Sequence, residues 1–325
     1  MVYRINRDPI IDNNRVLRVD RMRVGSFSQS YQFQGSTSGY TSGGNPINPA
    51  GNIIDKYPFA SNANATDVGD LTQKREVATG QSSGASGYTS GGRAPAYTNV
   101  IDKFPFSVDG NATDVGDLTG ARGYGAGQSS GDNGYMAGGI NPATPATENV
   151  IEKFSFSSDA NATDVGDMTQ ERYGLSGQSS TTHGYASGGA GSPFYDTTID
   201  KHPFAADANA TDVGDLTVGR SDNGSGQSST THGYHSGGYA SPGYSNIMDK
   251  FPFASNANAT DVGDMTQNKS TNAGQSSTTN GYITAGQLPF LYSNVIEKFP
   301  FSSDANATDV GDLTVSRATT AGQQV

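Results

Sequence analysis

The residues best suited to chemistry are pairs of aspartates in a Thr-Asp-Val-Gly-Asp string that occurs six times. The first pair is Asp67 and Asp70. Such carboxylates could form oxygen-rich calcium sites, although calcium loops usually bring more carboxylates in a tighter array. The alternative, which we favour, is Asx-turn and cap chemistry at a strand end. Six equal copies also argue against catalysis, because an active site needs one asymmetric constellation. We therefore predict no enzyme, no catalytic residue and no cofactor, with calcium at these turns as the open alternative.

Histidine and cysteine offer little more for a metal or a nucleophile. The chain has no cysteine, which excludes disulfides, thiolate metal sites and a cysteine nucleophile. Of its four histidines, His183 and His232 occupy the same place in neighbouring repeats, where other copies have serine or asparagine. His235 lies close to His232 in the sequence. A polar loop position explains this pattern better than a ligand cluster, so we predict no metal site.

Two further repeated motifs have simple structural interpretations. Asn-Ala-Thr sequons begin at Asn64 and at five equivalent positions, and we expect turns there rather than glycosylation, since the N-terminus lacks the apolar region of a signal peptide. Asp-Lys or Glu-Lys dipeptides recur six times, the first at Asp55 and Lys56. We expect these dipeptides to form a ring of exposed ion pairs, each contributing about 0–1 kcal/mol to stability.

The elements that carry these motifs follow from an internal repeat. Gly-Tyr steps, Thr-Asp-Val-Gly-Asp strings and Gly-Gln steps each occur six times at spacings of 47 to 50 residues. One unit, which starts at Gly226, contains four short strand candidates and no sustained 3.6-residue periodicity. The sequence thus predicts an all-β chain of six four-stranded antiparallel blades, which form a six-bladed β-propeller from repeats of roughly 48 residues.

Paired aromatic residues on the third strand predict the core. In Phe251-Pro252-Phe253 the two rings project to one face, because side chains alternate along a strand. Each buried phenylalanine would stabilise the fold by about 1.5–3 kcal/mol, and the pairs would fill the space between blades. Pro252 lacks a ladder donor, so the strand should end there or lie at an edge.

The order of the markers predicts how the ring closes. The first marker is Gly39-Tyr40, whereas the last Gly-Gln step, Gly322-Gln323, stands near the C-terminus with no Gly-Tyr after it. We therefore predict that a strand over residues 320–325 completes the first blade and removes an open sheet edge. Residues 31–38 are a competing candidate for that place. The propeller then spans residues 31–325, and residues 1–30 form an N-terminal extension.

The repeats resemble those of kelch-type propellers. A Gly-Gly doublet ends the second strand in five copies, as at Gly43-Gly44, while the sixth has Ala285-Gly286. The tryptophan usual in the fourth kelch strand is missing, and we expect Val115 and its equivalents to take its place. This resemblance implies a fold but says little about function.

A second resemblance concerns the particular residues of the repeat. The strings FPFxxxANATDVGDLT and GQSSTTHGYxSGG look like those of propeller proteins encoded by marine bacteriophages, cyanophages in particular, and residues 10–17 are similar to the leaders of phage tail-fibre proteins. The resemblance implies a non-enzymatic virion structural protein, tail-associated, assembled in the host cytoplasm and acting in host attachment or in tail and fibre assembly. Implied partners are other virion proteins and a host cell-surface glycan or protein, and a homo-oligomer in the particle is also open.

Charge separates the head of the chain from its body. Residues 1–25 hold six arginines and three aspartates, so their net charge of +3 leaves −14 for the rest of a chain whose total is −11. An acidic body is unsuited to nucleic acid, and no apolar run is long enough for a membrane helix. We predict that the basic head anchors the protein to the virion through Arg4, Arg7, Arg15, Arg18, Arg21 and Arg23.

The copies differ mainly in two sets of connections, which we expect on one face of the ring. Connections between strands two and three, and between one blade and the next, vary in length and content, while the others are nearly constant. Aromatic loops on a rigid scaffold suit recognition, with drift in unconstrained loops as the alternative. The candidate partner-binding residues are Tyr97, Phe194, Tyr195, Tyr239, Tyr244, Phe290, Leu291 and Tyr292. Two other functions remain open, namely a kelch-like protein-interaction scaffold and a carbohydrate-binding or carbohydrate-active propeller.

Overall fold

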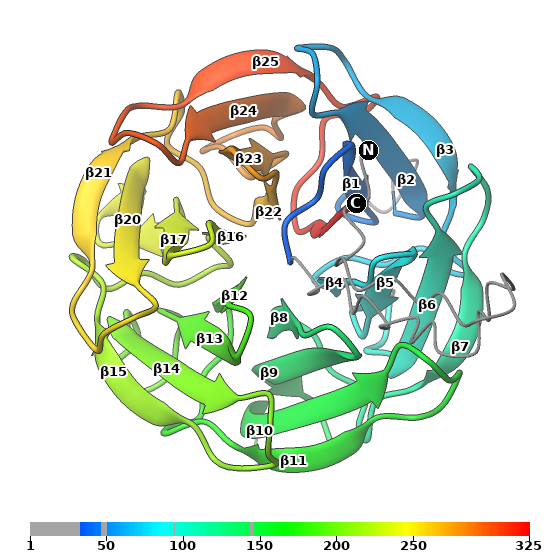
Figure 1. Ribbon diagram of the computed structural model, residues 1–325, viewed down its shortest axis with the longest axis horizontal. Coiled ribbons are helices and arrows are strands. Elements are labelled where there is room, and N and C mark those ends of the chain that lie inside the picture. The colour runs from blue at the N-terminus through cyan, green and yellow to red at the C-terminus, as the bar shows by residue number, and fades with distance from the viewer. Residues whose placement is uncertain (1–32, 47–50, 94, 144–145) are drawn as a thin grey trace, which may run out of the picture. The chain divides into compact units, whose positions relative to one another are not determined.

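The computed structural model describes residues 33–325, except for 47–50, 94 and 144–145. The described residues form six four-stranded antiparallel sheets arranged as blades around a centre, and they contain no helix (Figure 1). The chain is therefore all-β and folds as a six-bladed β-propeller, as the repeats predict. Among the described residues, no helix has the length and apolar composition needed to cross a membrane.

Each blade contributes one strand to each of four concentric positions, and blades are numbered here in chain order from the blade that holds β1. The innermost strands of blades one to six are β26 (Ala321–Gln324), β4 (Thr79–Ser82), β8 (Ala126–Ser129), β12 (Ser176–Ser179), β16 (Ser225–Ser228) and β22 (Ala273–Ser276). The second strands are β1 (Ser38–Ser42), β5 (Ser86–Ser90), β9 (Asn133–Asn141), β13 (His183–Ser187), β17 (His232–Ser236) and β23 (Asn280–Thr284). The third strands are β2 (Ile53–Pro58), β6 (Val100–Pro105), β10 (Ala146–Ser155), β14 (Thr198–Pro203), β20 (Ile247–Pro252) and β24 (Val295–Pro300). The outer strands are β3 (Thr66–Asp70), β7 (Thr113–Asp117), β11 (Thr163–Asp167), β15 (Thr211–Asp215), β21 (Thr260–Asp264) and β25 (Thr308–Asp312). A small extra hairpin, β18 (Tyr239–Ala240) with β19 (Gly243–Tyr244), follows the second strand of blade five.

The C-terminal strand closes the ring, which confirms the prediction for residues 320–325. β26 pairs antiparallel with β1, and Gln323 lies opposite Tyr40. Residues 33–37 do not form this strand. Instead, Thr37 donates its backbone N–H to the carbonyl of Val325, in the place where other blades have the turn between strands one and two. β26 therefore covers the edge of β1, and blade one has four strands like the other blades.

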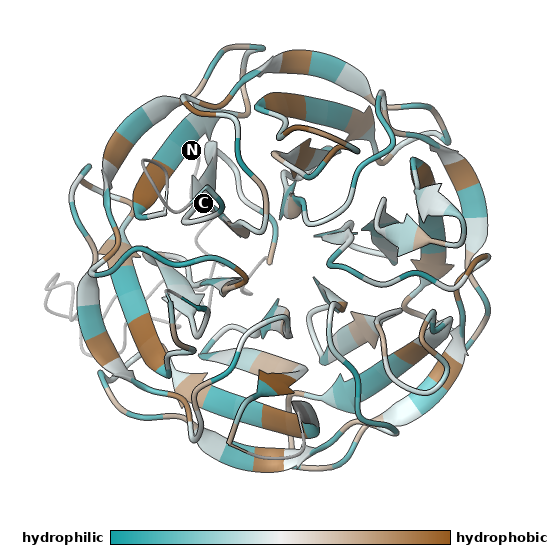
Figure 2. Ribbon diagram, turned by 180° about the vertical axis from the view of Figure 1, so that it is seen from behind, coloured by the Kyte–Doolittle hydropathy of each residue, from teal (hydrophilic) through white to brown (hydrophobic). Residues whose placement is uncertain are grey.

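The hydrophobic core lies between neighbouring blades, as the aromatic pairs predict. One cluster joins Tyr185 and Ile199 of blade four to Phe251 of blade five, with Phe253 packed against it, and five similar clusters surround the ring. Tyr185 stacks on Phe253 with ring centroids 4.8 Å apart. Figure 2 shows the resulting bands of hydrophobic residues along the outer strands. Val115 packs partly buried against one such cluster.

The third strand ends at its proline in five blades, for example at Pro252, and it is an interior strand of each sheet. Of the two possibilities that the sequence allowed, termination is therefore the correct one. The missing N–H falls at the last residue of the strand, where it removes little from the ladder.

The prediction that each Asp-Lys or Glu-Lys dipeptide forms an exposed ion pair is wrong for its acidic member. Successive residues of a strand point to opposite faces, so Asp102 is fully buried while Lys103 faces solvent. Asp102 pairs with the buried Arg75 of the preceding blade, with 2.7 Å between its Oδ2 and the guanidinium nitrogen. The lysine pairs instead with an aspartate of the following blade, Asp159, at 3.0 Å.

The buried pair recurs at all six junctions. Each carboxylate meets a cation that follows the outer strand of the preceding blade. The other five pairs are Arg122–Glu152, Arg172–Asp200, Arg220–Asp249, Lys269–Glu297 and Arg317–Asp55. The same carboxylates accept hydrogen bonds from the threonine that ends the Thr-Asp-Val-Gly-Asp-Leu-Thr string, as Asp102 does from Thr72. These contacts fix the angle between successive blades.

The two motifs expected to form turns also connect blades. Asp67 accepts a hydrogen bond from the N–H of Gly69 at 3.2 Å, an Asx turn of the predicted kind that recurs in every blade. The sequon asparagine Asn111 accepts a hydrogen bond from the N–H of Asp70, and Ala112 donates its own N–H to the carbonyl of Asp70. The loop of one blade thus clamps the outer strand of its neighbour and covers part of an exposed edge.

Candidate recognition surface

The connections of the blades define two faces. The turn between strands one and two meets the connection between strands three and four, as where Phe106 donates its N–H to the carbonyl of Ala85. We call this side the uniform face. On the other side, the connection between strands two and three meets the one that leads to the next blade, as where Gly92 bonds to the carbonyl of Arg122. We call that side the variable face, and all eight candidate partner-binding residues lie on it.

Four candidates form a continuous row on blades four and five. The rings of Phe194 and Tyr195 are 4.9 Å apart, those of Tyr195 and Tyr239 are stacked at 6.1 Å, and Tyr239 meets Tyr244 edge-on at 5.3 Å. Tyr239 and Tyr244 are cross-strand partners in the β18–β19 hairpin. Burial, followed by the charge of Asp222, raises the pKa of Tyr244 above its usual value. This set, Phe194, Tyr195, Tyr239 and Tyr244, is called the aromatic row below.

Three more candidates extend the surface onto blade six. Phe290 and Leu291 are 98% and 57% exposed, and Phe194 at the other end of the aromatic row is 54% exposed. A hydrogen bond from the N–H of Leu288 to the carbonyl of Leu291 closes the turn that presents them. Exposure of such large apolar side chains on ordered loops is typical of a contact surface.

The eighth candidate, Tyr97, lies apart from this row, on blade two. The Arg93 guanidinium sits over its ring at 5.9 Å and pairs with Glu76. Tyr97 is close enough to Tyr124 and Tyr173 to affect them electrostatically. The rings of Tyr124 and Tyr173 meet edge-on at 6.0 Å, and the sequence interpretation missed both residues. Burial raises the pKa of Tyr124 to about 12. Both missed tyrosines lie in the connections between blades, a few residues before a Gly-Gln step. An aromatic residue at that place was the signal in the sequence that could have identified them.

A groove surrounds the β18–β19 hairpin on the variable face. It has a volume of about 660 Å³, within the ~300–1,000 Å³ range of small-molecule sites. Tyr239 and Tyr244 of the aromatic row line it, together with Pro242, Pro289 and the amide-bearing Asn268. We call it the blade-five groove. None of its lining residues is a lysine, arginine, histidine, aspartate or glutamate.

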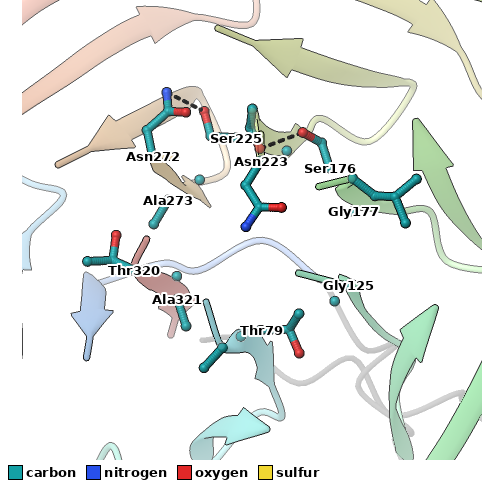
Figure 3. Close-up of a pocket in the computed structure, with 18 residues that line it drawn as sticks. Thr79, Gly125, Ser176, Gly177, Asn223, Ser225, Asn272, Ala273, Thr320 and Ala321 are labelled. Atoms are coloured by element: carbon teal, nitrogen blue, oxygen red, sulfur yellow. Dashed lines mark hydrogen bonds between the residues drawn. The ribbon is translucent and has the colours of Figure 1, made fainter. Parts of the chain in front are cut away.

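The centre of the ring is narrow and polar. Gly80, Gly127, Gly177, Gly226, Gly274 and Gly322 form a waist around it, and a Cβ atom on any of them would collide with the neighbouring glycine. Cavities of about 70 and about 60 Å³ lie on either side of this waist. Figure 3 shows the larger cavity, on the variable side, with Asn223 pointing into its middle. The centre is therefore too constricted to pass a substrate.

Backbone hydrogen bonds join the six blades in a closed circle at the variable end of this channel. Each bond runs from the residue two positions before one innermost strand to the equivalent residue of the preceding blade, or in one case to the residue just before it. They are Tyr124 N–H to Val77, Gly174 to Tyr124, Asn223 to Gly174, Thr271 to Asp222, Thr319 to Thr271 and Val77 to Thr319. At the uniform end, Phe33 lines the second cavity, and Gln34 bonds to the carbonyls of Ser228 and Ser277. The protein itself thus encircles the variable end of the channel and places Phe33 and Gln34 at the uniform end.

The histidines do not gather at one place. His183 and His232 each contact the neighbouring threonine on the uniform face, and His235 is buried, 2.9 Å from the Ser187 hydroxyl of the preceding blade. The part of the chain that the structure describes contains no group of three or more histidines, cysteines or carboxylates arranged to hold a metal ion.

The six arginines proposed as a virion anchor, between Arg4 and Arg23, lie outside the described residues. The structure thus places seven of the eight candidate partner-binding residues near one another on the variable face and places Tyr97 apart from them. It also adds the residues that line the blade-five groove to the candidate surface. No protein-family model matches this chain, and no curated protein matches it either.

Proposed function

We propose that this chain is a non-enzymatic bacteriophage virion protein, tail-associated and of kelch type, whose variable face contacts the host surface or a neighbouring virion protein. The observation that carries the proposal is the concentration of aromatic and apolar side chains on blades four to six of one face, from Phe194 to Tyr292. Aromatic anchors of this kind dominate the binding energy of protein contact surfaces.

The rigidity of the ring supports a binding role. Buried ion pairs, backbone bonds and stacked rings connect every blade to the next, so the loops of the variable face are held in fixed relative positions. A preorganised surface loses less conformational entropy when its partner binds.

The first described residues lie at the uniform end of the channel, opposite the variable face. Phe33 lies at the uniform end of the channel, and its ring meets Phe253 edge-on at 6.5 Å. The basic head is joined to the ring through this segment. In our proposal the head attaches to the particle, and the variable face is free to meet a partner.

Mass spectrometry of purified particles tests the virion assignment. The chain should be present in stoichiometric amount, and its absence from particles would overturn the proposal. A full-length variant with glutamine at the six head arginines should fold normally but be depleted from particles, because its positive charge is gone. Normal incorporation of that variant would remove the anchoring role of the head.

A further inference from the structure

The blade-five groove differs from the rest of the variable face in its chemistry. Its walls combine two tyrosine rings with the apolar surfaces of Pro242, Pro289 and Val218. The side chains of Asn246 and Asn268 stand at the same walls, and among the described residues neither amide has a hydrogen-bond partner. An amide group offers both donors and an acceptor, as a ligand rich in hydroxyl groups requires.

We infer that the blade-five groove binds a neutral oligosaccharide, an inference that rests on the proposed recognition role of the variable face. The apolar face of a sugar ring packs on an aromatic ring, and its hydroxyl groups both donate and accept hydrogen bonds. Tyr239 and Tyr244 supply the aromatic surface, and Asn246 and Asn268 supply the amides.

Charge selects a neutral sugar over an acidic one. The lining offers no cation to pair with a carboxylate or sulfate. The two cations nearest in sequence, Arg220 and Lys269, are fully buried and paired with Asp249 and Glu297. The carboxylate that acts on Tyr244 is Asp222, and the body of the chain is strongly acidic. An anionic ligand would meet repulsion without a compensating partner.

The groove is also a single site in an otherwise repeated structure. A tyrosine stands three residues before the third strand in four blades, at Tyr97, Tyr195, Tyr244 and Tyr292. Among the residues that the structure describes, only those of blade five pair this tyrosine with a second one across a regular hairpin, through Tyr239. The position of Asn268 is held by Glu171 at the junction of blades three and four. The sequence of blade five therefore builds a site that the other described blades lack.

Binding of the full-length protein to immobilised neutral oligosaccharides tests the inference. Glucan, galactan and mannan fragments serve as probes, with uronate-containing and sulfated fragments as the charged set. The expected result is binding to at least one neutral probe and none to the charged set. Tyr244→Ala and Asn268→Ala should each weaken it by about tenfold, whereas Tyr244→Phe, which keeps the ring, should retain most of it. Glu171→Ala is the matched control for Asn268→Ala and should bind as the unaltered protein does.

Binding to host cell envelopes separates failure of this inference from failure of the proposed function. If the inference is right, periodate oxidation of the envelopes abolishes binding and protease treatment of them does not. If envelope binding persists after periodate and no neutral probe binds, the oligosaccharide inference is wrong while the recognition role stands. If the protein binds neither envelopes nor virion proteins, the recognition role itself is wrong.

Discussion

At the scale of single residues, four of the six blade junctions hold two kinds of ion pair that differ in their surroundings. Arg75 and Asp102 are fully buried, whereas Lys103 and Asp159 are 29% and 61% exposed in their side chains. Removing one partner of a buried pair leaves an uncompensated charge in the interior, which costs about 3–5 kcal/mol, while an exposed pair contributes about 0–1 kcal/mol.

The two classes of pair should respond differently to truncation. Asp102→Ala is expected to lower the free energy of unfolding by about 3–5 kcal/mol, because it leaves the Arg75 guanidinium buried without an opposite charge. Lys103→Ala, at the next residue, should lower it by no more than about 1 kcal/mol. Urea denaturation of both variants measures this difference. Equal decreases in the free energy of unfolding would contradict the claim that the buried pair contributes more to stability than the exposed pair.

His202 makes stability depend on pH. It occupies the core position that a phenylalanine or tyrosine fills in the other blades, and burial lowers its pKa to about 4. Between pH 6.5 and 4 the unfolded chain binds a proton at this residue that the folded chain does not, so stability falls on acidification by about 1.4 kcal/mol per pH unit. The same reasoning applies to His235, whose pKa burial also lowers.

His202→Phe should remove this contribution. The Nε2 atom of His202 is buried without a partner, so the substitution is expected to stabilise the protein at pH 7 and more strongly at pH 5. Urea denaturation at several pH values between 7 and 4.5 gives the slope for both proteins. A variant whose stability falls with pH as steeply as that of the unaltered protein would contradict the assignment.

At the scale of elements, the innermost strands approach so closely that only glycine fits at the waist. A Cβ on Gly177 would collide with the backbone carbonyl of Gly127. Gly177→Ala should therefore cost at least about 1–3 kcal/mol, the usual range for overpacking. Gly84→Ala is the control, because a Cβ there meets nothing within 4 Å, and it should change stability by less than about 0.5 kcal/mol. Thermal unfolding compares the two, and similar melting temperatures would argue against a closed waist.

The C-terminal strand is expected to be essential for the ring. β26 supplies the innermost strand of blade one, and Gln323 donates a hydrogen bond to the carbonyl of Tyr88 in blade two. A chain that ends at Thr320 loses both contacts and exposes the edge of β1, which is a template for aggregation. Size-exclusion chromatography should show aggregated or unfolded protein. A monomeric truncated chain with an unchanged melting temperature would contradict this closure.

The sequence predicted these elements well, because the alternation of side chains along a strand is a local property and the repeat spacing puts each strand at the same position in every blade. It mispredicted the acidic member of the Asp-Lys dipeptides because the cation that neutralises Asp102 comes from another blade. A repeated signal was available, since Arg75 and its equivalents always stand three residues after the same threonine. The role of Asn111 as a clamp was also invisible, because its partner, Asp70, lies across a blade boundary.

At the scale of the whole molecule, the ring separates a structural face from a recognition face. Residues that are constant in the connections of the uniform face, such as Asn111, connect blades, and this explains why that face varies so little. On the variable face the contacts between blades are the buried ion pairs and the circle of backbone hydrogen bonds, and the loop segments outside them are free to diverge. Sequence alone placed the aromatic residues on one face, but only the angle between blades decides that Tyr195 meets Tyr239 while Tyr97 does not. The groove amides, Asn246 and Asn268, resemble ordinary turn residues in the sequence and are recognised only in three dimensions.

The central claim is that the variable face makes the contact with the partner, and the adsorption rate of particles to host cells tests it most directly. Particles that carry the double variant Phe194→Ser and Phe290→Ser lose the two exposed phenylalanines of this face. Val108→Ser, an exposed apolar residue in a connection of the uniform face, is the control. We expect the double variant to adsorb at least about tenfold more slowly and the control to adsorb normally. Normal adsorption of the double variant, or an equal loss in the control, would contradict the account.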